Sequence, residues 1–290
     1  MSQNTQEYPC MMHVEKMSTA DFSFAVQLAN TMNWNMTIED FEFILKLEPE
    51  GCFVLLSGSE RLGICTTISL GSLGWIGNLI VKEAYRKEGA GSLLLQQAIA
   101  YLKSKRTETI GLYAYPHLTS FYESFGFKPD IDFMILQGKG GAFPQEETEV
   151  HKAEKQHIQK IIEFDSQCLG ANRQKLLEAI LQKTENLCYI LPENAGISGY
   201  VAAKISASAA EVGPLVCPVN HVKAAKKLLK AVLSRLSGLD VSICLPKKEA
   251  ALLNLLRNAG FREAFRVVRM FLGPVADRRC IYIAESLERG

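Results

Sequence analysis

The sequence predicts a mixed α+β (α/β) fold in two similar copies, each a mixed, mostly antiparallel central sheet flanked by helices. First, the 290 residues are 48% apolar, and this length suits two domains of about 100–200 residues, each with its own core. Second, each half shows helical patterns, then short β-rich runs, then alternating strands and helices. Third, residues 76–81 and 122–127 match residues 212–217 and 256–261, which predicts an internal duplication.

Two short helices are expected near the start of the chain. Ser18 and Thr37 each stand three positions before an acid, Asp21 and Asp40, which is the pattern of a capping box, and helical apolar spacing follows. Runs rich in β-branched and aromatic residues then lie between glycines and serines. These runs predict strands at residues 52–56, 63–69 and 74–81.

A glycine-bearing loop at residues 86–91 leads into a helix with a broad apolar face that reaches Leu102. A strand is expected at residues 109–114, followed by a helix. Gly126 ends that helix as a C-cap glycine, and Phe127 resumes extended structure. The first half therefore closes as a strand, loop, helix, strand, helix and strand.

The second half repeats this plan after a linker. The segment from Gly138 to Val150 is rich in glycine and acids and contains one proline, which is typical of a linker. We therefore predict domains at residues 1–140 and 151–290, joined by residues 141–150. The later elements are expected as helices at 158–164, 173–181 and 222–236 and one ending at Gly260, and as strands at 187–191, 199–205, 211–217, 241–245 and through 270–272.

The composition excludes several classes of function. With 32 Lys and Arg against 31 Asp and Glu, the net charge of +1 disfavours nucleic-acid binding by bulk phosphate attraction. No apolar run approaches the roughly 18–20 residues of a membrane-spanning helix, and residues 1–7 lack the features of a signal peptide. We expect a cytoplasmic protein that does not act at a membrane and whose partner is a small molecule or another protein.

The eight cysteines are scattered, with no C-x-x-C pair and no histidine at zinc-ligand spacing. Most of them lie in apolar runs. We expect buried thiols, without a metal site or a disulfide.

The sharpest chemical signal is the loop after the strand at residues 79–81. Four residues later, Arg86-x-x-Gly89-x-Gly91 opens a long helix. Glycines allow close backbone approach, and the N–H groups of a helix N-terminus favour an anion such as pyrophosphate. A P-loop would need Gly-Lys-Ser/Thr, which is absent, and a dinucleotide fingerprint would need a third glycine where Leu94 stands.

Three blocks of the first half occur in a fixed order: residues 78–81 (Asn-Leu-Ile-Val), 85–91 (Tyr-Arg-Lys-Glu-Gly-Ala-Gly) and 121–127 (Phe-Tyr-Glu-Ser-Phe-Gly-Phe). With these blocks the first half resembles the GNAT superfamily of acyl-CoA-dependent N-acetyltransferases, whose R/Q-x-x-G-x-G/A loop and L-Y-x-x-x-G-F block they fit. One block alone is a weak signal. Three in order, with the expected helix and strand between them, are specific.

The second half shows a different set of blocks. Residues 213–215, 269–273 and 281–285 are similar to the YitH-type C-terminal acetyltransferase-like domain, which is the partner of an N-terminal GNAT domain. The second half has no glycine between residues 217 and 225, and Leu256 stands in the place of Tyr122. We therefore expect a degenerate CoA loop and a structural or substrate-shaping lobe.

The resemblance implies an acetyl-CoA-dependent N-acetyltransferase that moves an acetyl group to a primary amine by direct attack. Catalysis lies in the N-terminal domain, and the C-terminal lobe shapes the acceptor site. In that family the pantetheine arm pairs like an extra strand with the strand that ends here at Val81, and a backbone N–H faces the thioester oxygen. The implied acyl-CoA contacts are Leu79, Ile80, Val81, Arg86, Lys87, Glu88, Gly89, Ala90, Gly91 and Ser92.

Tyr122 occupies the position of the family's general acid. Reference pKa values of about 10 for a phenol and about 8.5 for a thiol allow it to protonate the departing thiolate. The alternative is a packing role, since a tyrosine shortly before a C-cap is often half-buried. His117, at the start of the same helix, is a weaker candidate for a base, because such a histidine usually caps the helix or faces solvent.

The sequence assigns no general base. Many members of the family carry a carboxylate early in the strand before the loop, and residues 74–78 contain none. Deprotonating an amine of pKa near 10.4 costs about 4–5 kcal/mol at neutral pH, so water, backbone carbonyls or an acid from another strand must help. The alternative is a catalytically weak acyl-CoA-binding regulatory or interaction protein. A binding protein without CoA would require the loop at residues 86–91 to be a coincidence, and the oligomeric state is not predicted.

Overall fold

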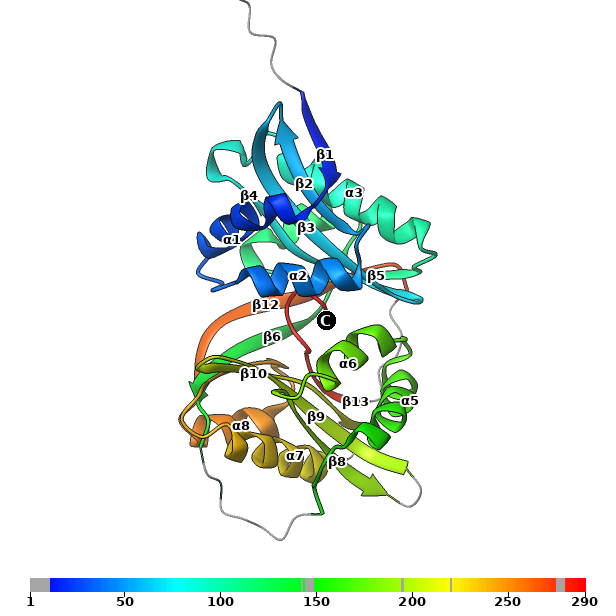
Figure 1. Ribbon diagram of the computed structural model, residues 1–290, viewed down its shortest axis with the longest axis vertical. Helices are drawn as coiled ribbons and strands as arrows, with labels where there is room; N and C mark the ends of the chain where they lie inside the picture. Colours follow the sequence, from blue (N-terminus) through cyan, green and yellow to red (C-terminus); the bar gives the residue numbers. More distant parts are fainter. Residues whose placement is uncertain (1–10, 142, 144–148, 194–195, 220, 275–279) are drawn as a thin grey trace, which may run out of the picture. The chain divides into compact units, whose positions relative to one another are not determined.

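The computed structural model describes residues 11–141, 143, 149–193, 196–219, 221–274 and 280–290 (Figure 1). The chain divides into two units, one with the described residues up to 69 together with 74–107, the other with residues 70–73 and the described residues from 108 onward. Each unit carries a mostly antiparallel sheet flanked by helices, which confirms the predicted fold class. The domain boundaries at residues 140 and 151 stay a prediction, and most of the expected linker (142 and 144–148) lies outside the described residues.

The first unit has the strand order β1-β2-β3-β4. The two expected capping boxes are confirmed: the backbone N–H groups of Ser18 and Thr37 donate to Asp21 at 2.8 Å and Asp40 at 2.9 Å. The strand β1 was not expected, because its five residues form no apolar run. The elements are β1 (Met12–Lys16), α1 (Phe22–Asn30), α2 (Ile38–Leu47), β2 (Cys52–Ser57), β3 (Glu60–Leu70), β4 (Leu73–Val81) and α3 (Ala90–Ser104).

Helix α3 packs tightly against the sheet of the first unit, while α1 and α2 lie in front of the strands in Figure 1. A Cβ on Gly63 would lie only 2.7 Å from the carbonyl oxygen of Ile80 and 3.1 Å from the side chain of Leu94. A Cβ on Gly74 would lie 2.9 Å from Leu102. These strand glycines let the side chains of α3 approach the sheet closely.

The second unit has the strand order β5-β12-β6-β11-β10-β9-β8-β7, and β13 pairs with β10. Its strand pairs are antiparallel except for β10 with β11. The elements are β5 (Thr109–Ala114), α4 (Thr119–Glu123), β6 (Lys128–Lys139), β7 (His151–Lys152), α5 (Ile158–Leu169), α6 (Gln174–Leu181), β8 (Leu187–Glu193), β9 (Gly196–Ser206), β10 (Ala209–Pro218), α7 (Val222–Arg235), β11 (Asp240–Pro246), α8 (Ala250–Asn258), β12 (Arg262–Leu272) and β13 (Cys280–Ile283).

The closing strands of the two predicted copies are exchanged. β12, from the second half of the sequence, lies between β5 and β6 of the first half, with Met270 opposite both Leu112 and Pro129. β6 in turn pairs with β11 through a continuous register in which Leu136 lies opposite Ile243. The exchange links the two halves of the sequence through backbone hydrogen bonds within one sheet.

Gly138, the first glycine of the expected linker, has a structural role in the exchanged strand. Gly138 is a residue of β6, paired with Val241 of β11, and not part of a flexible connection. A Cβ at this position would lie 2.7 Å from the ring of Phe261. Glycine is therefore used here for close packing.

The sheet of the second unit is covered on both faces. Along β8, Tyr189 and Leu191 belong to the core cluster beneath α7 and α8, whereas Cys188 and Ile190 belong to the cluster beneath α5. Successive side chains of a strand point to opposite faces, so both faces are buried.

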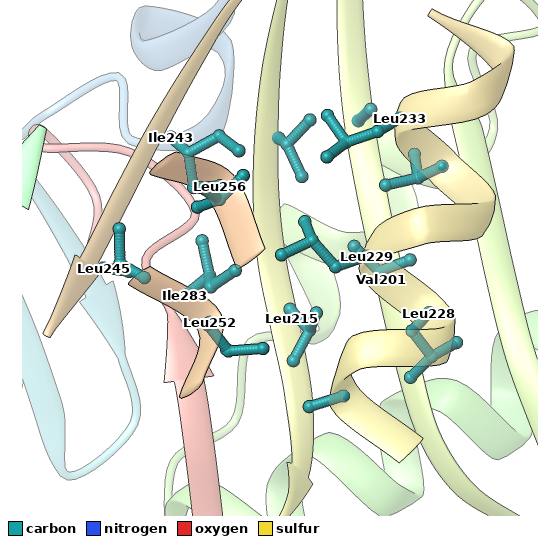
Figure 2. Close-up of a cluster of buried hydrophobic side chains, with 14 of the residues drawn as sticks. Val201, Leu215, Leu228, Leu229, Leu233, Ile243, Leu245, Leu252, Leu256 and Ile283 are labelled. Atoms are coloured by element: carbon teal, nitrogen blue, oxygen red, sulfur yellow. The ribbon is translucent and has the colours of Figure 1, made fainter. Parts of the chain in front are cut away.

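The larger core cluster lies between α7, α8 and the strands. Figure 2 shows Leu229 and Leu233 of α7 directed toward Val201 of β9 and Leu215 of β10. Burial of each such side chain stabilises the fold by about 1.5–3 kcal/mol.

The seven described cysteines are free, six of them are buried, and Cys168 is half-buried. Burial raises the pKa of Cys188 and Cys217 to about 12, which keeps both thiols protonated. This confirms the expectation of buried thiols for the described cysteines, and Cys10 lies outside the described residues. No cluster of His, Cys, Asp and Glu within the described parts of the chain has the arrangement of a metal site. No helix in the described ranges combines the length and apolar character needed to cross a bilayer.

Candidate functional site

The strand β4 is interrupted at Asn78, just before the residues expected to face an acyl thioester. Asn78 has φ 49°, a left-handed conformation that breaks the regular alternation of N–H and C=O directions in a strand. Its side chain is buried, and Nδ2 donates to Thr66 Oγ1 at 3.1 Å. Among the described residues, Oδ1 has no hydrogen-bond partner. Leu79, Ile80 and Val81 follow this irregular residue and complete β4.

The strand predicted at residues 74–81 was expected to be regular, although Asn78 carries a signal for this irregularity. Asparagine adopts the left-handed conformation more readily than other non-glycine residues, and Asn78 follows a glycine. An asparagine after a glycine, three residues before the end of an apolar strand, is a usable indication of such an irregularity.

The chain leaves β4 through a short 3-10 helix, Glu83–Tyr85, which is held by Glu60 at the start of β3. The carboxylate of Glu60 accepts hydrogen bonds from Lys82 Nζ and from the hydroxyl of Tyr85, each at 2.8 Å. These two hydrogen bonds lower the pKa of Glu60. The entry to the loop is thus fixed to the sheet at its outer end.

Arg86 lies directly after this turn and folds back on the strand end. Its Nε donates to the carbonyl oxygen of Val81 at 3.1 Å, and its Nη2 lies 3.8 Å from Sδ of Met32. A guanidinium carries five N–H donors. The Nε contact orients the group beside the end of β4, and the remaining donors can serve a phosphate.

The turn from Arg86 to Gly89 brings the chain to the N-terminus of α3. Lys87 has φ 70° and Gly89 has φ 85°, so two residues of this turn are left-handed. Of the residues expected to bind pyrophosphate, Arg86, Lys87, Glu88 and Gly89 are exposed, Ala90 is buried, and Gly91 and Ser92 are partly buried.

Gly89 is the N-cap of α3, and no described side chain caps this helix. Within the described structure, no atom lies within 4 Å of the position that a Cβ on Gly89 would take. The N–H groups of Ala90, Gly91 and Ser92 precede the first complete helical turn, so the helix supplies them no acceptor. An open, uncapped helix N-terminus beside Arg86 and Lys87 fits a pyrophosphate group.

The buried acids described in the first unit are both engaged in structural contacts. Asp21 binds Arg61 Nε at 2.7 Å. Glu48 accepts the backbone N–H of Ser69 at 2.8 Å and the hydroxyl of Tyr101 at 2.5 Å. Both carboxylates already accept hydrogen bonds, so neither is a candidate general base. The sequence likewise assigned no general base.

Tyr122 belongs to α4 of the second unit, whereas residues 79–92 belong to the first unit. The ring of Tyr122 is 7% exposed and packs edge-on against Phe121 at 5.0 Å and Phe127 at 6.1 Å. The helix ends at Glu123 with Ser124 as its C-cap, and Gly126, which was expected as the C-cap, has φ 88° two residues later. The role of Tyr122 as general acid stays a prediction. His117 is exposed and stacks on a neighbouring ring.

The second copy differs from the first at the loop and at the tyrosine. β10 has an irregular register between Val212 and Leu215, at the positions that match 76–79. The following helix α7 starts from His221, with φ −102°, and without a left-handed glycine. Leu256, in the place of Tyr122, is fully buried in the core. The strand irregularity is retained, but the glycine turn and the hydroxyl are replaced.

Two family models with the description acetyltransferase (GNAT) domain match the chain, at residues 48–129 and 161–282, which together span more than half of its length. The chain is also 22% identical over 276 residues to the holothin acyltransferase of Pseudoalteromonas sp. (strain SANK 73390), covering 94% of this chain and 92% of that protein.

Solved structures share the fold. A putative acetyltransferase from Pyrococcus horikoshii is similar with a TM-score of 0.81 and 21% identity, covering 100% of this chain and 99% of that chain. A tandem GNAT protein from the clavulanic acid biosynthesis pathway is similar with a TM-score of 0.63 and 14% identity, covering 92% of this chain and 100% of that chain. Because both halves match GNAT domain models, the chain belongs to the GNAT acetyltransferase family and carries two of its domains in tandem.

Proposed function

We propose that the chain is an acetyl-CoA-dependent N-acetyltransferase that acetylates a primary amine by direct attack, with its catalytic site in the first copy. One observation carries this proposal. The irregular end of β4 leads through a left-handed turn to the open, uncapped N-terminus of α3 at Gly89. Family membership supports acyl transfer, and GNAT domains generally use acetyl-CoA.

Different residues of the first unit bind the pyrophosphate and the pantetheine arm of acetyl-CoA. The N–H groups of Ala90, Gly91 and Ser92, with the guanidinium of Arg86, receive the pyrophosphate. The backbone of residues 79–81 pairs with the pantetheine arm, and the left-handed backbone at Asn78 turns one N–H toward the thioester oxygen. Acetyl-CoA supplies the acetyl group as an activated thioester.

Proton transfer needs a donor for the thiolate and an acceptor for the amine. The hydroxyl of Tyr122 is the proposed donor. Since both buried acids of the first unit are engaged, we propose that the amine loses its proton to solvent. The second copy, without the glycine turn and the tyrosine, serves as a non-catalytic lobe of the YitH type.

The acceptor is proposed to be a small molecule, with an amine on a protein as the second possibility. The support is the name of the 22% identical relative, which states that it acylates holothin.

Two variants of Gly89 test the binding site. Asparagine and aspartate have nearly the same shape and both tolerate a left-handed backbone, so only Gly89→Asp adds a charge that repels phosphate. In calorimetric titration with acetyl-CoA, we expect Gly89→Asn to stay within a few-fold of wild type. Gly89→Asp should bind at least about tenfold more weakly, a loss of about 1.4 kcal/mol or more. Equal affinities for the two variants, or no binding by wild type, would contradict the proposed site.

The pH dependence of turnover tests the solvent route for the amine proton. Without a dedicated base, kcat/KM should rise about tenfold per pH unit up to the pKa of the free amine. An acceptor amine of lower pKa should move the plateau down by the same number of pH units. An inflection that stays at one pH for all amines would instead reveal an enzyme base.

The engaged acids also favour a second candidate, a catalytically weak acyl-CoA-binding regulatory protein. This candidate predicts the same binding results with the Gly89 variants but no amine-dependent release of thiol. The two candidates therefore separate on turnover alone.

A further inference from the structure

The strands β10 and β11 of the second copy form a fork. They pair in parallel only through residues 209–212 of β10, where Val212 lies opposite Ile243. Beyond the irregularity at Val212, β10 pairs instead with β13, in an antiparallel register that places Leu215 opposite Ile283. The backbone N–H of Ala284 then donates to the carbonyl oxygen of Cys244 in β11 at 2.9 Å. The closing segment, residues 280–290, thus bonds to both arms of the fork.

This fork corresponds in sequence to the proposed acyl-CoA site of the first copy. Residues 212–217 match residues 76–81, whose backbone is proposed to pair with the pantetheine arm. We infer that the second copy takes no acyl-CoA, because the closing segment of this same chain occupies the place of the pantetheine arm as a built-in strand. This inference rests on the proposed function for one premise, that the matching strand of the first copy pairs with the pantetheine arm.

The closing segment fits the fork closely. Ile283 is fully buried and lies beside Leu215, Leu245 and Leu252 in the core (Figure 2). A Cβ on Gly213 would lie 1.9 Å from the carbonyl oxygen of Ala284, so the bare glycine backbone is needed to admit the segment. The occupant is therefore packed as a permanent part of the core.

Charged partners hold the part of the segment beyond the fork. Glu285 is fully buried, and its carboxylate binds Arg289 Nε at 2.9 Å and Lys204 Nζ. Lys204 also donates to the backbone oxygen of Glu285 at 3.0 Å. Burial opposes the ionised form, but Arg289 and Lys204 outweigh it and hold the pKa of Glu285 at about 2.

A second buried group binds the segment near Gly290. Arg173 is 2% exposed and donates from Nη1 to the backbone oxygen of Gly290 at 3.2 Å. The same guanidinium binds Asp165 through Nε at 3.0 Å and Nη2 at 2.6 Å. Buried charges need such partners, and displacement of the segment would leave Lys204 and Arg173 without some of theirs. Displacement by a ligand is therefore opposed by both packing and charge.

Two measurements on the intact chain test this inference. The first is calorimetric titration with acetyl-CoA, for which we expect one site per wild-type chain and one site in Gly89→Asp that binds at least about tenfold more weakly. Two sites, or a site that survives in Gly89→Asp with unchanged affinity while wild type binds more than one equivalent, would overturn the inference and leave the proposed function intact. No binding at all would overturn the proposed function, and the second measurement then decides the inference.

The second measurement is hydrogen exchange of the closing segment, followed by mass spectrometry with and without saturating acetyl-CoA. We expect strong protection of residues 281–290 that changes less than twofold on addition of acetyl-CoA. Exchange that accelerates tenfold or more with acetyl-CoA, or a segment unprotected from the start, would overturn the inference. The matched reference is β9, which should keep its protection in either case.

Discussion

Replacing Tyr122 by phenylalanine is expected to lower kcat by about a hundredfold or more, with acetyl-CoA affinity changed less than twofold. The substitution removes only the hydroxyl, and the edge-on contacts with Phe121 and Phe127 depend on the ring, so packing is kept. The loss arises because the departing thiolate no longer receives its proton from the enzyme. Steady-state thiol release and calorimetric titration on the same preparation measure the two quantities.

A second tyrosine provides the matched control. Tyr101→Phe also removes one hydroxyl, but that hydroxyl binds the buried carboxylate of Glu48. It is expected to lower stability by about 1–3 kcal/mol through the lost hydrogen bond and to leave turnover within a few-fold. If Tyr122→Phe and Tyr101→Phe have equal effects on kcat, Tyr122 is a packing residue.

Replacing Arg173 by methionine is expected to destabilise the protein by about 3–5 kcal/mol. Asp165 is fully buried, and both of its carboxylate oxygens accept from the guanidinium of Arg173. Methionine fills part of the volume but leaves this carboxylate unpaired in the core. Denaturant unfolding followed by circular dichroism gives the free energy of unfolding.

A surface ion pair serves as the control for this change. Arg266 binds Glu263, three residues earlier in β12, and both side chains reach solvent. Arg266→Met should cost less than about 1 kcal/mol. The double variant Asp165→Asn with Arg173→Met should recover part of the loss, because it removes the buried charge. A loss below about 1 kcal/mol for Arg173→Met alone would contradict the structural role given to this pair.

The elements that the sequence predicted correctly depend on local chemistry. The capping boxes at Ser18 and Thr37 each act within one turn of the chain, and each appears where expected. The short edge strands β1 and β7 were missed, because so few residues, exposed or only partly buried, give no periodic signal.

Long-range pairing could not be predicted in this way. β6 and β12 were each expected to close their own half, and they are exchanged between the halves. Both strands bury consecutive residues, 133–136 in β6 and 269–271 in β12, and suit more than one neighbour, so their residues alone do not select a partner. The insertion of β13 beside β10 is a long-range choice of the same kind.

In the candidate site too, local features were predicted from the sequence and contacts between distant residues were not. The loop from Arg86 to Ser92 is a contiguous segment, and the helix that starts within it was expected from spacing alone, whereas the left-handed turn at Lys87 and Gly89 was not. The contact from Arg86 to the carbonyl of Val81 and the buried amide of Asn78 depend on neighbours across strands. These contacts had no separate signature in the sequence.

The most direct test of the central claim is amine-dependent release of thiol from acetyl-CoA by the wild-type chain, with mass analysis of the amine. The account predicts thiol release that saturates with a small primary amine, and that amine should gain one acetyl group. In Gly89→Asp, kcat/KM for acetyl-CoA should fall at least about tenfold. Binding of acetyl-CoA with no thiol release above the amine-free rate, across a broad panel of amines, would contradict it and leave the regulatory binding protein as the function.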